Sequence, residues 1–297
     1  MTNYKFSRPL TTPKYITVQG QARSGKGTLV KALVGALCDH YRIYSIDQGL
    51  KFRVFARMAI EQSLDYENLD LLESFVQDPA SQAEALERLQ AAPDMAKNER
   101  DEMYYAHQVG NVSGMFGKIP ATHEVVVQLL KDEVRAAVGS YDIIVVDGRA
   151  MQKYGQELED ADVVDHMLAI DVVCEPLVAA RRVLGIFEPV EQLDSEQLVQ
   201  LIHTTEDISR RNSSDARRKR DPSVFLHEAF ELDVLHMPET DAEFERMCEK
   251  VSEVGVLSID NSFTRSIAQL TEPSVKLIRR VVELSFDKPR KPLWSAD

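Results

Sequence analysis

Tyr15-Ile-Thr-Val-Gln19, a short and mostly apolar run, leads directly into the glycine-rich stretch Gly20-Gln-Ala-Arg-Ser-Gly-Lys-Gly-Thr28. After it, leucines recur at every fourth position from 29 to 37, which is the spacing of one helical face. A strand, a glycine-rich turn and a helix in this order form the context that a phosphate-binding loop requires. We therefore predict that nine residues bind the phosphates of ATP: Gly20, Gln21, Ala22, Arg23, Ser24, Gly25, Lys26, Gly27 and Thr28.

The chemistry of phosphate binding explains these residue types. Glycine allows the backbone to turn tightly around phosphate oxygens, and the amide groups at a helix N-terminus favour negative charge. Lys26 would place its ammonium group beside the β- and γ-phosphates. The general pattern has Ser or Thr directly after the lysine to bind Mg²⁺, whereas here Gly27 intervenes before Thr28. An accidental glycine-rich turn is the alternative, and the flanking strand and helix count against it.

Strand and helix patterns alternate along the chain. Strands are expected at 15–19, 42–46, 142–146, 166–173 and 256–259, and helices at 28–38, 49–108, 123–138 and 262–284. This alternation predicts an α/β protein with the three-layer fold of P-loop NTPases, in which helices flank a parallel sheet. Ligands bind such sheets at the carboxyl ends of the strands, where Asp47 and Asp147 fall.

Asp147 closes an almost wholly apolar strand, and this is where P-loop proteins place the carboxylate that orients Mg²⁺ and its waters. We predict that Asp147 binds Mg²⁺ through water, although Asp-Gly is also a common turn dipeptide. Asp47 ends the neighbouring strand, so it would serve the same cation or the phosphate of an acceptor.

The segment from 209 to 220 carries six basic residues and one acid. One interpretation is a solvated basic helix or a patch for nucleic acid or localisation. The other is a lid whose arginines close over the transferred phosphoryl group and neutralise its charge. Together with the phosphate loop, the cluster favours a lid at 206–222.

Composition limits the partners and the compartment. The chain has 297 residues and a formal net charge of −13, which argues against a nucleic-acid polymer as partner. No stretch has the uninterrupted apolar length of a membrane span, and the N-terminus has no secretory pattern. Three separated cysteines and seven scattered histidines indicate no zinc site and fit a reduced cytoplasmic protein. Residues 61–108 hold twelve acidic and three basic side chains; this acidic stretch would shape an acceptor pocket or bind an unknown protein partner.

Five collinear motifs resemble those of the cytidylate kinase family, the P-loop kinases of nucleoside monophosphates. Gly20 to Thr28 resembles the family's GxxGxGKGT loop, which accounts for Gly27. The other four are Asp47-Gln-Gly-Leu-Lys-Phe-Arg53, Val109-Gly-Asn-Val-Ser113 with Pro120, Asp147-Gly-Arg-Ala-Met151, and Arg211, Asp215 and Arg218 on the R-x3-D-x2-R lid pattern. The chain resembles a divergent member of this family, since Arg23 stands where the family's loop has a glycine. That replacement would disturb the backbone of the loop or add a charge near the phosphates.

The resemblance implies roles for single residues. Arg53 and Arg149 would grip the phosphate of the acceptor, Arg211 and Arg218 would act as lid arginines, and Asp215 would be their companion acid. Gln48, His123 and Ala150 stand near family positions that help to read the cytosine ring, where the family has Ser or Thr, Arg and Asp. Cytosine would then lack the hydrogen bonds that distinguish it, so the resemblance implies kinase chemistry with an altered or relaxed acceptor.

The implied organisation is a kinase core with insertions. The expected segments are a tail at 1–13, a core at 14–60, 120–205 and 255–285, an acceptor-binding insertion at 61–119, a lid at 206–222, an extra segment at 223–254 and a tail at 286–297. The expected reaction is ATP-dependent phosphorylation of a nucleoside monophosphate, with CMP or dCMP first and Mg²⁺ as the cofactor. The alternatives are a kinase for another small acceptor and a nucleotide-binding regulator without turnover.

Overall fold

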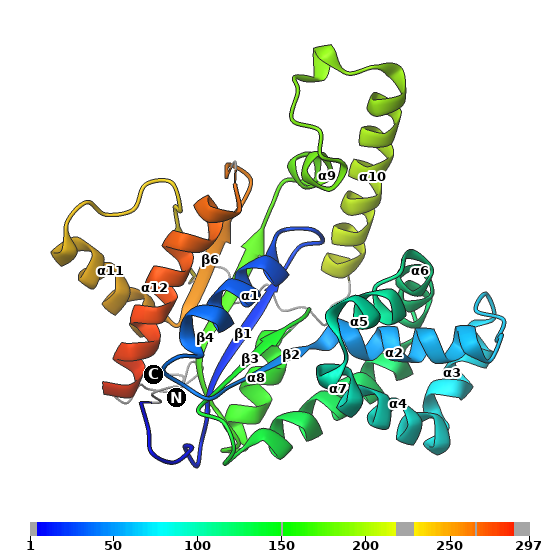
Figure 1. The fold of residues 1–297 in the computed structure, drawn as a ribbon, viewed down its shortest axis with the longest axis horizontal. Coiled ribbons are helices and arrows are strands. Elements are labelled where there is room, and N and C mark those ends of the chain that lie inside the picture. The colour runs from blue at the N-terminus through cyan, green and yellow to red at the C-terminus, as the bar shows by residue number, and fades with distance from the viewer. Residues whose placement is uncertain (1–4, 150, 218–228, 265, 288–297) are drawn as a thin grey trace. The chain divides into compact units, whose positions relative to one another are not determined.

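The computed structural model describes residues 5–149, 151–217, 229–264 and 266–287, and the side chains of 214–217 are outside the description. The chain divides into two compact units, one of Met1–Ile46 and Val138–Asp297 (unit 1) and one of Asp47–Ala137 (unit 2). Unit 1 contains the sheet and unit 2 is helical (Figure 1). Among the described helices, none combines the length and the apolar character that a membrane crossing requires.

A six-stranded sheet forms the centre of unit 1, with the strand order β2-β3-β1-β4-β6-β5. Its strands are β1 (Lys14–Gly20), β2 (Ile43–Asp47), β3 (Ile143–Asp147), β4 (Asp165–Val173), β5 (Phe230–Leu232) and β6 (Val256–Asp260). β1 pairs in parallel with β3 and β4, and β6 pairs in parallel with β4 and β5. The predicted α/β fold is therefore confirmed. The edge strand β5 is an addition, because its three residues are too few to show a strand pattern in the sequence.

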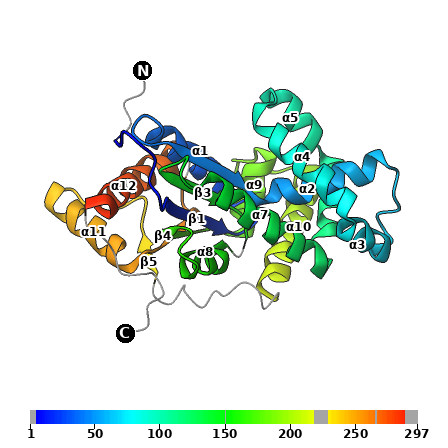
Figure 2. The same ribbon diagram turned by 90° about the horizontal axis from the view of Figure 1, so that it is seen from below.

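Helices cover both faces of this sheet. The helices of unit 1 are α1 (Lys26–Leu37), α8 (Met151–Asp160), α9 (Pro176–Leu184), α10 (Ser195–Arg217), α11 (Asp241–Val254) and α12 (Ile267–Asp287), with a 3-10 turn η2 (Val190–Gln192). Of these, α9 and α10 pack against each other. Figure 2 shows α1 and α8 on opposite faces. Alternate residues of β1, Ile16 and Val18, pack against Leu29 and Leu33 of α1, because successive strand side chains point to opposite faces. This packing sets the start of α1 at the carboxyl end of β1.

The C-terminal helix begins at Ile267, so the predicted start at residue 262 is wrong. Residues after β6 form a loop instead, because their side chains bind distant backbone. The hydroxyl of Ser262 accepts a hydrogen bond from the amide of Glu175 at 2.9 Å, and the amide group of Asn261 donates to the carbonyl of Ser24 at 2.7 Å. These bonds hold the loop against the start of α9 and against the phosphate loop.

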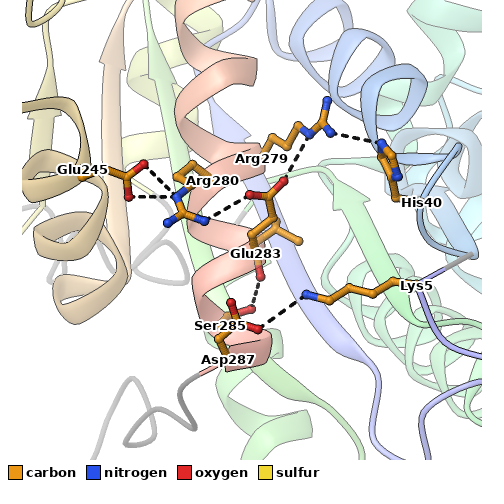
Figure 3. A network of polar contacts seen from close by, with 9 residues as sticks. Lys5, His40, Glu245, Arg279, Arg280, Glu283, Ser285 and Asp287 are labelled. Atoms are coloured by element: carbon orange, nitrogen blue, oxygen red, sulfur yellow. Dashed lines mark hydrogen bonds and ion pairs between the residues drawn. The ribbon is translucent and has the colours of Figure 1, made fainter. Parts of the chain in front are cut away.

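Charged side chains connect α12 to its neighbours (Figure 3). Arg280 Nε lies 3.0 and 2.9 Å from the two carboxylate oxygens of Glu245 on α11, and Arg280 Nη1 lies 3.2 Å from Glu283. Glu283 also accepts from Arg279, whose Nη2 contacts the His40 ring after α1 at 3.0 Å. Because these groups are about one-third exposed or more, solvent screening limits each pair to about 0.5 kcal/mol of stability. The network therefore contributes more to how α12 lies against α11 and α1 than to the free energy of unfolding.

Cys248 gives the packing of α11 a measurable pH signature. Burial, with Glu245 nearby, raises the pKa of the Cys248 thiol to about 12. The unfolded chain releases this proton at lower pH than the folded chain. The contribution of the protonated thiol to the free energy of unfolding is therefore fully present below about pH 9 and is lost as the pH rises toward 12. Between pH 9 and 10 we expect the wild type to lose about 1 kcal/mol more unfolding free energy than Cys248→Ala, measured by urea titration. Cys38→Ala, at an exposed thiol, should follow the wild type, and an equal loss in Cys248→Ala would refute the assignment.

Unit 2 is a helical bundle with its own core. Its helices are α2 (Gln48–Glu61), α3 (Leu69–Gln77), α4 (Pro79–Ala91), α5 (Lys97–Tyr104), α6 (His107–Phe116) and α7 (Pro120–Ala137), with a 3-10 turn η1 (Ala92–Asp94). Phe55, Phe75 and Phe116 form a mutual aromatic cluster in the core. The predicted long helical stretch at 49–108 is thus five helices and one 3-10 turn. The buried Lys51 on α2 pairs with Glu133 on α7, which compensates the cost of burying its charge.

Candidate active site

Two glycines give the phosphate loop its shape. Gly20 has φ 141° and Gly25 has φ 98°, both in the region that side chains disfavour. A Cβ at Gly20 would lie 2.0 Å from the carbonyl oxygen of Val172, and one at Gly25 would lie 2.7 Å from Nδ2 of Asn261. Both positions therefore require glycine, for the backbone conformation and for the close approach of a neighbour.

The sheet and the loop after β6 hold the phosphate loop from two sides. The amide of Gln21 donates to the Val172 carbonyl at 3.2 Å, and the Gln21 side chain accepts from the amide of Cys174 at 2.9 Å. On the other side, the buried Asn261 donates to the carbonyl of Ser24 at 2.7 Å. Asn261 is itself held by Arg182 of α9, whose Nη2 donates to the Asn261 carbonyl at 2.6 Å. These bonds restrict the loop backbone, which lowers the entropic cost of binding a phosphate.

Lys26 opens α1 directly after the loop. Gly25 is the N-cap and makes no side-chain capping bond, so no N-cap side chain competes for the amide groups of the first turn. The ammonium group of Lys26 donates to the Gln21 carbonyl at 3.1 Å, so the side chain folds back over the loop. Thr28 lies exposed in the same turn. Positive charge and helix amides thus converge on one short stretch of backbone.

Arg23 adopts the left-handed conformation, with φ 61°. The loop therefore keeps the turn that glycine would give, and the arginine bears the steric cost of a Cβ in that region. The sequence left two consequences of this replacement open, a disturbed loop backbone or an added charge near the phosphates. In the structure the loop keeps its turn, and Arg23 takes a strained backbone conformation. The side chain is exposed, so its charge lies at the surface of the loop.

Arg23→Gly should stabilise the protein. Relief of the left-handed strain, less the greater freedom of glycine in the unfolded chain, leaves a gain of about 0.5–1 kcal/mol in unfolding free energy. A urea titration measures it. Arg23→Ala is the matched control, because alanine removes the charge and keeps the Cβ, so it should bring no such gain. An equal gain in both variants would show that the charge, and not the backbone, carries the cost.

Asp147 ends β3 close to the start of α1. A Cβ built on Gly27 would lie 3.7 Å from Oδ2 of Asp147, so the carboxylate faces the first turn of the helix. The amide of Gly148 donates to the Val18 carbonyl at 3.1 Å, which fastens the following turn to β1. Arg149 lies in that turn and is partly exposed. Ala150 lies outside the described residues.

Residues 206–217 of the predicted lid fall on α10, which packs against α9 (Figure 1). The remaining lid residues, 218–222, lie outside the described residues. Arg211 is exposed on this helix. Its neighbour Asn212 accepts a hydrogen bond from the amide of Ala22 in the phosphate loop at 2.9 Å, a contact that the sequence did not reveal. Asp215 also belongs to α10, although its side chain is outside the description, and Arg218 lies outside the described residues.

Unit 2 brings Asp47 and Arg53 together around Tyr105, which sequence reasoning missed. The Tyr105 hydroxyl donates to Oδ2 of Asp47 at 2.6 Å, and the Arg53 guanidinium lies 4.3 Å from the ring centroid. Burial and the Asp47 carboxylate raise the pKa of Tyr105, so it remains a donor at neutral pH. A Cβ at Gly49 would lie 2.9 Å from Oδ1 of Asp47, so glycine leaves room for the carboxylate over the start of α2. Tyr105 thus contacts both the Asp47 carboxylate and the Arg53 guanidinium.

Gln48 and His123 occupy sheltered positions in unit 2. Gln48 is 6% exposed in the first turn of α2. His123 Nε2 contacts the Gly117 carbonyl at 2.8 Å, which requires that this nitrogen carry the proton. Its ring meets Phe52 edge to face at 5.2 Å between centroids. One ring nitrogen of His123 is therefore engaged by the protein itself.

The parallel sheet, the glycine-rich loop and the helix that follows define a P-loop nucleotide-binding protein. A family model described as "Cytidylate kinase" matches residues 16–253, and the chain belongs to the cytidylate kinase family. That family comprises nucleoside monophosphate kinases, which use ATP as co-substrate.

Individual relatives are distant. The cytidylate kinase of Bartonella quintana is 26% identical over 247 residues, which cover 82% of this chain and 96% of the relative. The cytidylate kinase of Bartonella henselae is 24% identical over 243 residues, with the same coverage of 82% and 96%. The cytidylate kinase of Mesorhizobium japonicum is 29% identical over 134 residues, covering 45% of this chain and 51% of that protein. The low identities leave room for differences in the acceptor.

Proposed function

We propose that this protein transfers the γ-phosphoryl group of ATP to a nucleoside monophosphate, with CMP and dCMP as the first acceptors to test. The observation that carries the proposal is the preformed phosphate loop, in which Gly20 and Gly25 take conformations that glycine favours and Lys26 opens α1. Phosphoryl transfer needs mainly alignment and charge neutralisation, which such a loop supplies. Family membership supports the monophosphate as the acceptor.

The residues around Asp147 fit a Mg²⁺ ion. Mg²⁺ in kinases is held by one or two carboxylates, several waters and the substrate phosphates, so a dedicated protein cage is not required. The described residues contain no cluster of three or more His, Cys, Asp or Glu side chains that could form such a cage. The Asp147 carboxylate faces the first turn of α1, and the hydroxyl of Thr28 in that turn would supply a second oxygen donor. Bound Mg²⁺ would neutralise charge on the β- and γ-phosphates.

We propose that Arg53 and Arg149 bind the phosphate of the acceptor. The resemblance of their motifs to the family supports both roles, and arginine suits them because its planar fork binds phosphate oxygens in pairs. In unit 2 the ring of Tyr105 and the Asp47 carboxylate restrict where Arg53 can lie. The altered residues Gln48, His123 and Ala150 support a relaxed preference for the acceptor base.

We propose that α10 and its arginines serve as the lid. Closure over ATP excludes water, which would otherwise compete with the acceptor for the phosphoryl group. Arg211 would then neutralise charge that develops during transfer, and Arg218 and Asp215 keep the roles that the resemblance implies.

An ATP-coupled assay with CMP, dCMP, UMP, AMP and GMP tests the proposal. We expect ADP release to depend on a monophosphate, and CMP to exceed UMP in kcat/KM by less than about tenfold, because the cytosine-reading residues are altered. ATP binding without turnover of any monophosphate would refute the reaction and favour a kinase for another acceptor or a regulator. A preference for CMP above about a hundredfold would refute only the inference from Gln48, His123 and Ala150.

A further inference from the structure

One hydrogen bond connects the phosphate loop to α10 rather than to the sheet. The amide of Ala22 donates to Oδ1 of Asn212 on α10, 190 positions later in the chain, at 2.9 Å. By contrast, Gln21 is bound by Val172 of β4 and by Cys174 just after that strand. Ser24 is bound by Asn261 in the loop after β6. The Asn212 contact therefore differs in kind, since it joins the loop to the proposed lid.

The chemistry of the contact fixes the orientation of the Asn212 amide. A backbone N–H can only donate, so the atom that meets Ala22 must be the side-chain oxygen. The amide nitrogen Nδ2 therefore points elsewhere, and it is buried without a hydrogen-bond partner in the described part of the chain. The bond to Ala22 therefore selects this orientation of the side-chain amide.

The hydrogen bond from Ala22 to Asn212 lies next to the strained turn of the phosphate loop. Ala22 is 4% exposed and directly precedes Arg23, where the backbone enters the left-handed region. On the other side, Asn212 directly follows Arg211 on the regular helix α10. A shift of Asn212 would therefore move the base of Arg211 and the turn of the loop together.

We propose that Asn212 is a positioning residue whose Oδ1 latches α10 onto the phosphate loop and so sets the lid relative to bound ATP. The proposal rests on the kinase function proposed above. Asn212 does not supply charge to the reaction. Its effect passes through the placement of α10, so loss of the latch should slow the transfer step more than it weakens ATP binding.

Three variants separate the latch from general damage to the helix. Asn212→Ala removes the acceptor oxygen, Asn212→Asp keeps an oxygen that can accept the same N–H, and Ser213→Ala changes an exposed neighbour on α10. The first readout is hydrogen exchange at the Ala22 amide in the nucleotide-free protein, resolved by NMR. We expect exchange at least about tenfold faster in Asn212→Ala, and near wild-type rates in Asn212→Asp and Ser213→Ala. Unchanged exchange in Asn212→Ala, or equally fast exchange in Asn212→Asp, would overturn the latch.

The second readout is steady-state kinetics with CMP and ATP. We expect kcat to fall about tenfold in Asn212→Ala while KM for ATP changes less than about threefold, and kcat to recover in Asn212→Asp. KM for ATP should rise in Asn212→Asp, because its new charge lies near the phosphates. Confirmed exchange with an unchanged kcat would overturn the positioning role. If the wild type turns over no monophosphate, the proposed function fails on its own, and the exchange experiment still decides the latch.

Discussion

Replacing Lys26 by alanine should reduce kcat/KM for phosphoryl transfer by about a thousandfold, the largest effect expected in this chain. The ammonium group lies at the start of α1, where the helix amides also face incoming phosphate. It donates to the Gln21 carbonyl at 3.1 Å, so the side chain that would bind ATP already lies at the loop. The coupled assay with CMP, together with ATP binding by calorimetry, measures the loss in turnover and affinity.

Lys31→Ala is the matched control for this result. Lys31 lies on the same helix, is exposed and has the same charge, so its loss should change kcat/KM less than about twofold. Thermal unfolding of both variants shows whether the fold is intact. If Lys26→Ala retained more than a tenth of wild-type activity, the loop would not be the site at which the transferred phosphoryl group is held.

Replacing Asp147 by asparagine should lower kcat by about a hundredfold or more. The Asp147 carboxylate faces the first turn of α1, beside the position proposed for the ATP phosphates. Asparagine keeps the shape but loses the charge that Mg²⁺ prefers. The variant should therefore need more Mg²⁺ for half-maximal rate. It should bind metal-free ATP at least as tightly as the wild type, because a negative charge beside the phosphates is removed.

Calorimetry in EDTA and rate measurements over a Mg²⁺ titration give these two quantities. Asp160→Asn, at an exposed carboxylate at the end of α8, is the matched control and should behave as the wild type. A purely structural Asp147 would lower stability and leave the Mg²⁺ dependence unchanged. That outcome would move the cation site to another residue.

Local features of the structure were predictable from the sequence. The phosphate loop needs glycine at positions fixed by backbone geometry, so Gly20 and Gly25 mark it in the sequence. The central strand β3 is a continuous apolar run that ends at Asp147, and the edge strand β2 ends at Asp47, so both acids lie at strand ends as predicted. In each case the physical cause lies within about ten consecutive residues, which is why the pattern is legible.

Contacts between distant residues were not predictable. Asn261 lies 237 positions from the Ser24 carbonyl that it binds, and Asn212 lies 190 positions from Ala22. Neither asparagine has a local signature, because an amide that binds distant backbone resembles any polar surface residue. Tyr105 was missed for the same reason: it sits between two short helices in an acidic stretch, and its bond to Asp47 depends on how the helices of unit 2 pack. The start of the C-terminal helix was predicted too early, at residue 262, because the long-range hydrogen bonds that hold the loop after β6 leave no pattern in the sequence.

The departures from the family concentrate on the acceptor. Apart from Arg23, the loop keeps the residue types that phosphate chemistry needs, as do Asp147 at the end of β3 and Arg211. At the position near the family's base-reading arginine, His123 directs one ring nitrogen to the Gly117 carbonyl, and Gln48 is buried in the first turn of α2. These contacts favour a kinase whose phosphate handling is retained and whose base selection has changed.

The central claim is ATP-dependent phosphorylation of a nucleoside monophosphate, and direct observation of the product tests it best. Purified protein is incubated with ATP, Mg²⁺ and CMP, and ³¹P NMR follows the nucleotides, with Lys26→Ala as the parallel sample. The account predicts that the two resonances of CDP appear in step with those of ADP in the wild type and stay absent in the variant. ADP formed with inorganic phosphate and no CDP, or no change in ATP while ATP still binds, would contradict it.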